Sequence, residues 1–256
     1  MKALLRKFYH NHYRFKPVKI LGRVACLGNE IITQLNLEKG LINHQKSRVD
    51  FLLDLANDSK IKPNDKEIIP LLEKNYISGT IYQQQFNFFS RSKPDIIIMD
   101  SFSELTDQLF ENKLDRTKFL ANYSDIRHDE QFNSRYITKG LLNLEQLYDI
   151  YHNFFEKIKK NYPATHILFI HFPTTLDKRE KFQERGKAIL HAIEKLSLEF
   201  KNLHSISIED EFVYPTIKNS DELKDFPYHY GTETYKNFVT KVIKTIDGIG
   251  LNLYAK

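Results

Sequence analysis

The sequence VKILGRVACLGNEI, residues 18 to 31, indicates the architecture of this chain, because an extended run passes directly into a helical one. Val18–Cys26 is rich in β-branched and aliphatic residues and is typical of a buried strand, and Asn29–Leu37 is typical of the helix after it. Two glycines and the chain's only cysteine lie near the junction. Such a junction can hold a catalytic nucleophile, bind a phosphate through backbone N–H groups, or serve only as a turn.

The same order of strand and helix recurs along the chain. Pro94–Asp100 is the clearest strand, because the unbroken apolar run Ile96–Met99 between polar residues is typical of a central strand in a parallel sheet. Further strands are predicted at His166–Phe172 and, as an edge strand, at Leu203–Ile208, with a weaker one near residues 40–43. The helices predicted from apolar periodicity are Ser47–Ala56, Leu142–Asn161, Lys178–Phe200 and Thr234–Ile246.

This alternation predicts an α/β fold, a three-layer α/β/α sandwich with a mostly parallel central sheet. We expect a single domain over residues 1–256, in which the polar and irregular segment 111–138 is an excursion or a lid. Ligands of such sheets bind beyond the carboxyl ends of the strands. The segments of interest are therefore residues 25–29, 100–104, 171–174 and 209–211.

Composition limits the classes of function. The longest apolar runs are too short to span a bilayer, and the N-terminus lacks the apolar core of a secretion signal. We therefore expect a cytoplasmic protein, with peripheral attachment to the inner face of the membrane as an alternative. A single cysteine excludes an internal disulfide. The net charge of +5 permits an anionic partner, although the scattered basic residues, with a local excess only from Lys2 to Lys19, equally suit a solvated face. No motif supports a nucleic-acid partner.

The junction at Cys26 is the first candidate site. Gly22 and Gly28 are six residues apart and no Lys-Ser/Thr pair follows, so a P-loop is excluded. A thiol at a helix N-terminus has a lowered pKa and is nucleophilic, but a free cysteine is often a small buried apolar residue instead. Asn29 could cap the helix or donate a hydrogen bond to an oxyanion.

The second candidate site follows the clearest strand, at Asp100-Ser101-Phe102-Ser103-Glu104. Asp100 could orient a histidine or bind a hydroxyl, and Ser101 or Ser103 could donate a hydrogen bond or act as a nucleophile. The alternative is a capping box, in which a serine begins the next helix and Glu104 lies three residues after Ser101.

The third candidate is His229, in PYHYGTETY before the last helix. A histidine in an aromatic, glycine-containing turn is well placed to act as a general base, although a surface or stacking histidine would have the same surroundings. His171 is the next candidate because it lies at a strand end. No HExxH pattern occurs, and we predict no metal site.

Taken in order, VACLGNEI, PDIIIMDSFSEL and YHYGTETYKNF resemble the SGNH/GDSL hydrolase-like superfamily. The nearest resemblance is to bacterial SGNH-like proteins found with capsule and surface-polysaccharide genes, and it covers nearly the whole chain through short motifs. Three features depart from the superfamily pattern. Its nucleophilic serine would fall at Ala25, Asp225 lies four residues before His229 instead of three, and the usual asparagine has no counterpart in residues 100–104.

The resemblance implies an enzyme of surface or capsular polysaccharide biosynthesis or modification that transfers an acyl group, such as acetyl, to a sugar hydroxyl or hydrolyses such an ester. The implied catalytic residues are His229 as general base, Cys26 and Asp100. The backbone amides after Cys26 would form an anion hole. Residues expected to bind or orient the substrate are Arg23, Asn29, Arg48, Ser101, Glu104 and His171.

No cofactor is required by this hypothesis, although an acyl-coenzyme A donor would suit the basic surplus. The expected partners are a sugar or glycan and other proteins of polysaccharide biosynthesis. A rival hypothesis is a non-catalytic glycan- or nucleotide-binding component of a biosynthetic complex, which the missing serine favours. A phosphoryl or glycosyl transferase on a similar sheet is a third.

Overall fold

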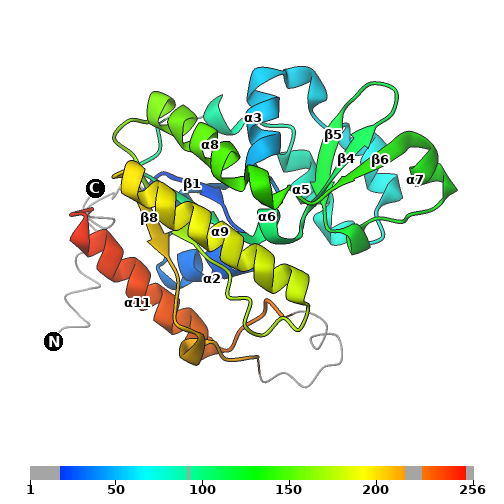
Figure 1. The fold of residues 1–256 in the computed structure, drawn as a ribbon. Coiled ribbons are helices and arrows are strands. Elements are labelled where there is room, and N and C mark those ends of the chain that lie inside the picture. The colour runs from blue at the N-terminus through cyan, green and yellow to red at the C-terminus, as the bar shows by residue number, and fades with distance from the viewer. Residues whose placement is uncertain (1–17, 91–92, 217–226, 252–256) are drawn as a thin grey trace.

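The computed structural model describes residues 18–90, 93–216 and 227–251, and its centre is a five-stranded sheet (Figure 1). The strand order is β2-β1-β3-β7-β8, and each neighbouring pair is parallel. The strands are β1 (Ile20–Arg23), β2 (Leu41–Asn43), β3 (Ile96–Asp100), β7 (His166–Ile170) and β8 (Leu203–Ile206). This confirms the predicted parallel sheet, including the weak strand near residue 41 and the edge position of β8.

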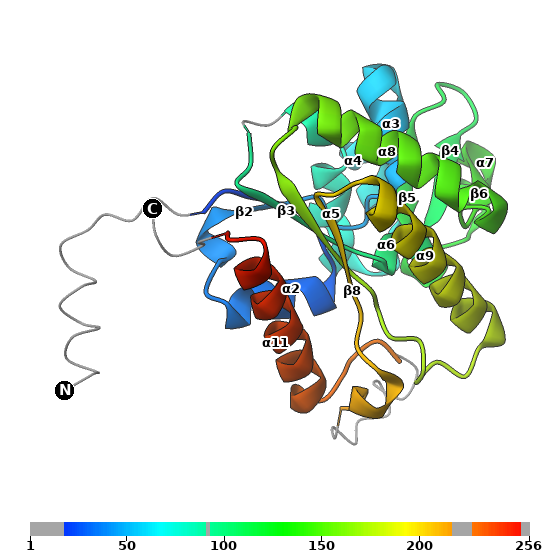
Figure 2. The ribbon, with the colours of Figure 1, turned by 60° about the vertical axis from the view of Figure 1, so that its left-hand side comes forward.

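Helices cover both faces of the sheet, as the two ribbon views show (Figures 1 and 2). On one face α2 (Cys26–Gln34) contacts α11 (Thr232–Gly248). On the other, α8 (Leu147–Asn161) contacts both α3 (Val49–Asn57) and α9 (Glu180–Glu199). The three-layer α/β/α prediction is therefore confirmed. One boundary was wrong, because Cys26 begins α2 and does not end the strand.

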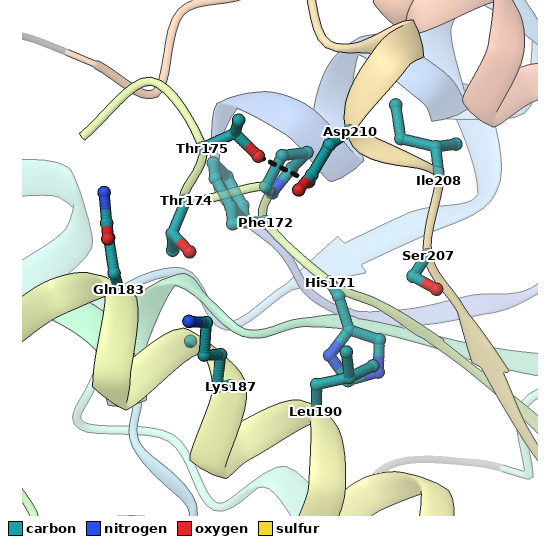
Figure 3. A pocket seen from close by; sticks show the side chains of 12 residues that line it. His171, Phe172, Thr174, Thr175, Gln183, Lys187, Leu190, Ser207, Ile208 and Asp210 are labelled. Carbon is teal, nitrogen blue, oxygen red and sulfur yellow. Dashed lines mark hydrogen bonds between the residues drawn. The ribbon is translucent and has the colours of Figure 1, made fainter.

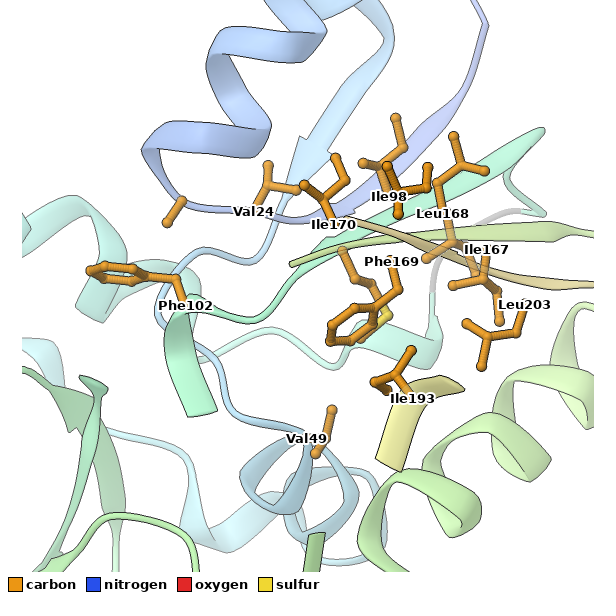
Figure 4. Packing of buried hydrophobic residues seen from close by; sticks show 14 of the residues in the cluster. Val24, Val49, Ile98, Phe102, Ile167, Leu168, Phe169, Ile170, Ile193 and Leu203 are labelled. Carbon is orange, nitrogen blue, oxygen red and sulfur yellow. The ribbon is translucent and has the colours of Figure 1, made fainter. Parts of the chain in front are cut away.

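The central strands are apolar throughout because both of their faces are buried. Figure 4 shows Leu168 and Ile170 on one face of the sheet and Phe169 on the other, toward Ile193 of α9 and Val49 of α3. Burying one such side chain contributes about 1.5–3 kcal/mol. Most of the large fully buried side chains are phenylalanines. Phenylalanine therefore contributes mainly to the core of this fold.

Residues 111–138, expected to be irregular, contribute to all three strands of a second, antiparallel sheet of order β5-β4-β6. Its strands are β4 (Gln108–Asn112), β5 (Lys118–Ala121) and β6 (Tyr136–Gly140), and α7 (Glu130–Arg135) precedes β6. Phe110, Phe119 and Phe132 form the centre of a separate small core beneath it. The prediction of irregular structure was wrong because short strands with few apolar residues give a weak periodic signal. A lid function stays a prediction.

Short helices complete the described chain. The α-helices are α4 (Asp65–Ile68), α5 (Ser78–Gln83) and α6 (Phe102–Thr106), and the 3₁₀ helices are η1 (Glu38–Gly40), η2 (Ser59–Ile61), η3 (Ile69–Leu71), η4 (Asn75–Ile77), η5 (Phe88–Ser90), η6 (Tyr123–Asp125), η7 (Leu144–Gln146) and η8 (Asp210–Phe212). Within the described ranges, no helix combines the length and the apolar content needed to cross a membrane. Most of the basic N-terminal excess, residues 2–17, lies outside these ranges.

Candidate functional site

The strand order identifies one crevice at the carboxyl edge of the parallel sheet. The connection after β1 leads to α2 and then outward to β2, whereas the connection after β3 leads the other way, toward β7. Neighbouring strands with diverging connections form the switch point where ligands of such folds bind. Ala25 and Cys26 lie on the β1 side of this crevice, and Asp100 and Ser101 lie on the β3 side.

Asp100 occupies the start of α2. Its Oδ2 accepts a hydrogen bond from the Ala25 N–H at 2.6 Å, and its Oδ1 accepts one from the Phe102 N–H at 3.2 Å. Burial raises the pKa of this carboxyl to about 7, although the amide of Ala25 and the charge of Arg23 lower it. Asp100 therefore occupies the backbone donor at the N-cap of α2, which precedes the amides after Cys26 that were expected to form the anion hole.

Asn29 lies inside α2, so its predicted role as the helix cap is wrong; Ala25 is at the N-cap. The side chain of Asn43, at the end of β2, binds both backbone groups of Val24: its Oδ1 accepts from the N–H at 3.0 Å and its Nδ2 donates to the carbonyl at 2.9 Å. The same Nδ2 is 3.5 Å from Asn29 Oδ1. Asn43 thus holds the strand-to-helix junction in shape.

Cys26 is poorly suited to act as a nucleophile. Burial, reinforced by the charge of Asp100, raises the pKa of its thiol to about 12. Its Sγ lies 3.8 Å from the carbonyl oxygen of Tyr228. Because the thiolate is the reactive form, the structure favours the alternative interpretation, a small side chain packed at the crevice.

Arg23 and Glu104 form a buried ion pair beneath the crevice. Arg23 Nη1 lies 2.9 and 2.8 Å from the two carboxylate oxygens of Glu104, and its Nη2 donates to the Asp100 carbonyl at 2.7 Å. The exposed fractions of the two side chains are 1% and 0%. Glu104 also accepts from the Val49 N–H at 2.9 Å. These contacts join β1, β3 and α3, and they account for both residues without a substrate.

Two other predicted substrate ligands are also held by protein groups. Ser101 is the N-cap residue of α6, as the capping-box interpretation placed it, but its side chain makes no cap hydrogen bond. Its Oγ instead accepts a hydrogen bond from the Phe172 N–H at 2.9 Å. Arg48 is buried, pairs with Asp50 at 2.5 Å and donates to the Gly140 carbonyl at 2.8 Å. It thereby links α3 to the second sheet. Substrate binding by these residues stays a prediction that no contact here supports.

His229 lies in a segment that is anchored on both sides. Tyr228 OH donates to Asp177 Oδ2 at 2.5 Å, and Tyr230 OH donates to the Pro173 carbonyl at 2.7 Å. His229 itself is half-buried, and this burial lowers the pKa of its imidazole. The ring of Tyr228 packs against Phe102 at a centroid distance of 5.7 Å. The three predicted segments around residues 25, 100 and 229 therefore meet at one crevice. Asp225 lies outside the described residues.

His171 directly follows the last residue of β7. Burial lowers the pKa of its imidazole to about 3, so the ring is neutral, and its Nε2 lies 3.0 Å from Ser205 Oγ. It borders a cavity of about 410 Å³ between the ends of β7 and β8 and helix α9 (Figure 3). Among the described residues, no cluster of metal-ligating side chains occurs.

The sequence analysis missed three residues that shape the site. Asn43 ends the weakest predicted strand, and Asp177 lies in the polar run before α9, so neither had an unusual local pattern. Lys187 lines the cavity but is one of many basic residues along α9. Only the flanking tyrosines of His229 gave a local signal, because both are bulky residues with a polar tip that usually finds a partner when buried.

Comparisons with known proteins give likenesses among solved structures, and two of them are described below. No protein-family model matches the sequence, and no curated protein matches it. A GDSL-like lipase from Bacteroides ovatus ATCC 8483 aligns with 92% of this chain and 54% of its own, at 15% identity and a TM-score of 0.45. The acetyl xylan esterase Est2A from Butyrivibrio proteoclasticus aligns with 93% and 65%, at 12% identity and a TM-score of 0.43.

This chain therefore spans only about half to two thirds of the length of those two enzymes. Their low identities and TM-scores transfer neither residues nor activity to it. The α/β fold class rests on the strand order and the helix layers described above.

Proposed function

We propose that this protein is an SGNH-like enzyme of bacterial surface or capsular polysaccharide biosynthesis or modification, acting on an acyl ester of a sugar. It transfers an acyl group such as acetyl to a sugar hydroxyl, or hydrolyses such an ester, without a covalent serine or cysteine intermediate. The polysaccharide setting comes from the sequence resemblance alone.

The observation that carries the proposal is the state of His229. His229 is half-buried in the segment whose neighbouring residue, Tyr228, contacts Cys26, and burial favours the neutral form of its imidazole. The anchored tyrosines on either side hold the backbone that carries it. A general base must be unprotonated and accessible in order to take a proton, and His229 meets both conditions.

In this mechanism His229 removes the proton from a sugar hydroxyl, or from water in hydrolysis. The oxygen attacks the acyl carbonyl and forms a tetrahedral intermediate with a negative oxygen. Collapse of that intermediate breaks the bond to the leaving group, which takes the proton back from His229. The backbone amides in the first turn of α2 would donate hydrogen bonds to the oxyanion. The amide of Ala25 is not among them, because it already donates to Asp100.

The decisive experiment compares His229→Ala with Cys26→Ala, using hydrolysis of p-nitrophenyl acetate and consumption of acetyl-coenzyme A with sugar acceptors. We expect a loss of about 10²–10⁴-fold in turnover for His229→Ala and little change for Cys26→Ala, because removal of a general base has that order of effect. His191→Ala, on the exposed face of α9, is the matched histidine control. Equal activity of wild type and His229→Ala would contradict the proposal.

The pH profile gives a second check. Because the pKa of His229 is lowered, its neutral form prevails from below pH 6.5 upward. We therefore expect kcat/KM to fall as the pH drops through a value below 6.5 and to stay level above it. An inflection well above 6.5 would assign the base to another group.

One observation favours a second candidate, a non-catalytic glycan-binding component. Ala25 stands where the resemblance expects a serine, and the Asp100 carboxylate lies 2.6 Å from its N–H, where it would compete with an oxyanion. This candidate predicts that sugars bind while every acyl donor stays intact.

A further inference from the structure

The cavity between β7, β8 and α9 is separate from the switch-point crevice. Its volume is about 410 Å³, which fits the range of small-molecule sites. Figure 3 shows Gln183 and Lys187 reaching into it from α9, with Thr174 and Thr175 opposite. It lies at the carboxyl ends of the strands, the edge where ligands of parallel sheets bind.

The polar groups around this cavity are varied and nearly balanced in charge. Lys187 supplies one positive charge and Asp210 one negative charge, and His171 is neutral. The carboxylate of Asp210 accepts a hydrogen bond from Thr175 Oγ1 at 2.5 Å, drawn as the dashed line in Figure 3. Donors and acceptors on several sides suit a ligand that carries many hydroxyl groups, since each hydroxyl both donates and accepts.

His171 adds an unmet hydrogen-bonding group. Its side chain is 5% exposed, and among the described residues its Nδ1 has no hydrogen-bond partner. Figure 3 shows the ring at the inner end of the cavity, between Lys187 and Ser207. A buried polar atom without a partner costs about 1–3 kcal/mol. A ligand hydroxyl near this nitrogen would reduce that cost.

A glycine in α9 shapes the opposite wall. A Cβ on Gly186 would lie 2.6 Å from Thr174 Cγ2 and 2.9 Å from its Oγ1. The missing side chain therefore lets Thr174 approach the helix closely, so that its hydroxyl stays near Gln183 and Lys187. The cavity also has apolar walls, formed by Phe172, Leu190 and Ile208.

We propose that this cavity binds an uncharged sugar ring, with its hydroxyls on Gln183, Lys187 and Asp210 and its C–H face on the apolar walls. A phosphate would meet the carboxylate of Asp210, and a fully apolar ligand would leave the polar groups desolvated and unpaired. The sugar would be the acyl acceptor only if the proposed function holds, whereas the binding itself does not depend on it. Tyr230 OH, one residue from His229, donates to Pro173 in the cavity wall at 2.7 Å.

The test is saturation-transfer-difference NMR of the full chain with methyl glycosides of glucose, galactose, mannose, xylose and N-acetylglucosamine. We expect at least one glycoside to bind, with an affinity about tenfold or more weaker in Lys187→Ala and Gln183→Ala, since each change removes a hydrogen bond to the ligand. Lys181→Ala removes the same charge from an exposed position on the same helix, outside the cavity, and should bind as wild type does.

Two results would overturn the proposal. One is that none of the glycosides binds, or that Lys187→Ala and Lys181→Ala bind equally well. The other is tighter binding of glucose 6-phosphate or glucuronate than of any neutral glycoside, which would make this an anion site. Sugar binding by a protein that turns over no acyl donor would instead refute the proposed catalysis alone.

Discussion

The switch-point crevice and the cavity at β7 and β8 lie at the same edge of one sheet, yet they differ in how they are filled. In the crevice, Asp100 bonds the start of α2, and Phe102, Phe172 and Tyr228 pack above it. In the cavity, Gly186 lets Thr174 approach α9 closely, and the side chains of α9 and of the loops after β7 and β8 leave open space lined with polar groups. The topology therefore fixes the carboxyl edge of the sheet as the place for a ligand. The packing of side chains then decides which part of that edge is open.

The largest expected effect concerns the buried ion pair of Arg23 and Glu104 beneath the crevice. Glu104→Gln leaves the Arg23 guanidinium buried without its charged partner, which should lower the free energy of unfolding by about 3–5 kcal/mol. The measurement is urea unfolding followed by circular dichroism. The matched control is Glu233→Gln, which removes an exposed pair with Lys236 and should change the free energy by about 0.5 kcal/mol or less. Similar urea-unfolding midpoints for the two variants would show that the Arg23–Glu104 pair does not stabilise the fold.

The next effect concerns the thiol in the crevice. With the pKa of Cys26 at about 12, its reaction with Ellman's reagent at pH 8 should be on the order of 10³ slower in the folded chain than in guanidinium. The single cysteine makes the signal unambiguous, and the folded-state rate should keep rising with pH beyond 9. A folded-state rate equal to the unfolded one would restore Cys26 as a candidate nucleophile.

A smaller effect is expected where the two regions are joined. Asp177→Asn weakens the bond from Tyr228 OH and the ion pair with Arg179, and it should cost about 1–3 kcal/mol of stability. Because its partners lower the pKa of Asp177, the stabilisation is present above the unfolded-state pKa near 4 and is lost as the pH falls through the lower folded-state value.

Tyr228→Phe removes the same bond from the other side. A double-mutant cycle of the two changes should therefore be non-additive. If His229 is the base, Tyr228→Phe should also lower kcat more than it changes KM, which a purely structural bond would not do.

The smallest effect is the stability of the cavity variants. Lys187→Ala removes an exposed group beside open space, so it should shift the free energy of unfolding by no more than about 0.5 kcal/mol. Gln183→Ala also removes the hydrogen bond from Gln183 Nε2 to the Asp177 carbonyl, so it should cost about 0.5–1.5 kcal/mol. Thermal unfolding of both variants beside wild type measures this. A large loss of stability would mean that these side chains support the fold, and a loss of sugar binding could not then be assigned to lost contacts.

The predicted and the observed site agree in place more than in role. The segments around Ala25 and Asp100 lie together because they follow neighbouring parallel strands, and the segment of His229 reaches them through Tyr228, whose carbonyl oxygen lies 3.8 Å from Cys26 Sγ. The roles of single side chains were less predictable. Arg23 and Glu104 look like substrate ligands when read locally, but they pair with each other across 81 residues of sequence. Asn29 and Ser101 look like helix caps, yet Asn29 lies inside α2, and Ser101 stands at the N-cap of α6 without a side-chain cap bond.

The sequence by itself determined the parallel sheet and its covering helices, because runs such as Ile96–Met99 and the apolar face of α8 are local patterns that burial requires. Only the tertiary structure decided the chemistry of the edge. The pKa of Cys26, the capture of the α2 start by Asp100 and the anchoring of Tyr228 by Asp177 all depend on groups distant in sequence. Electrostatics and hydrogen bonding act through space, so residue order alone leaves them open.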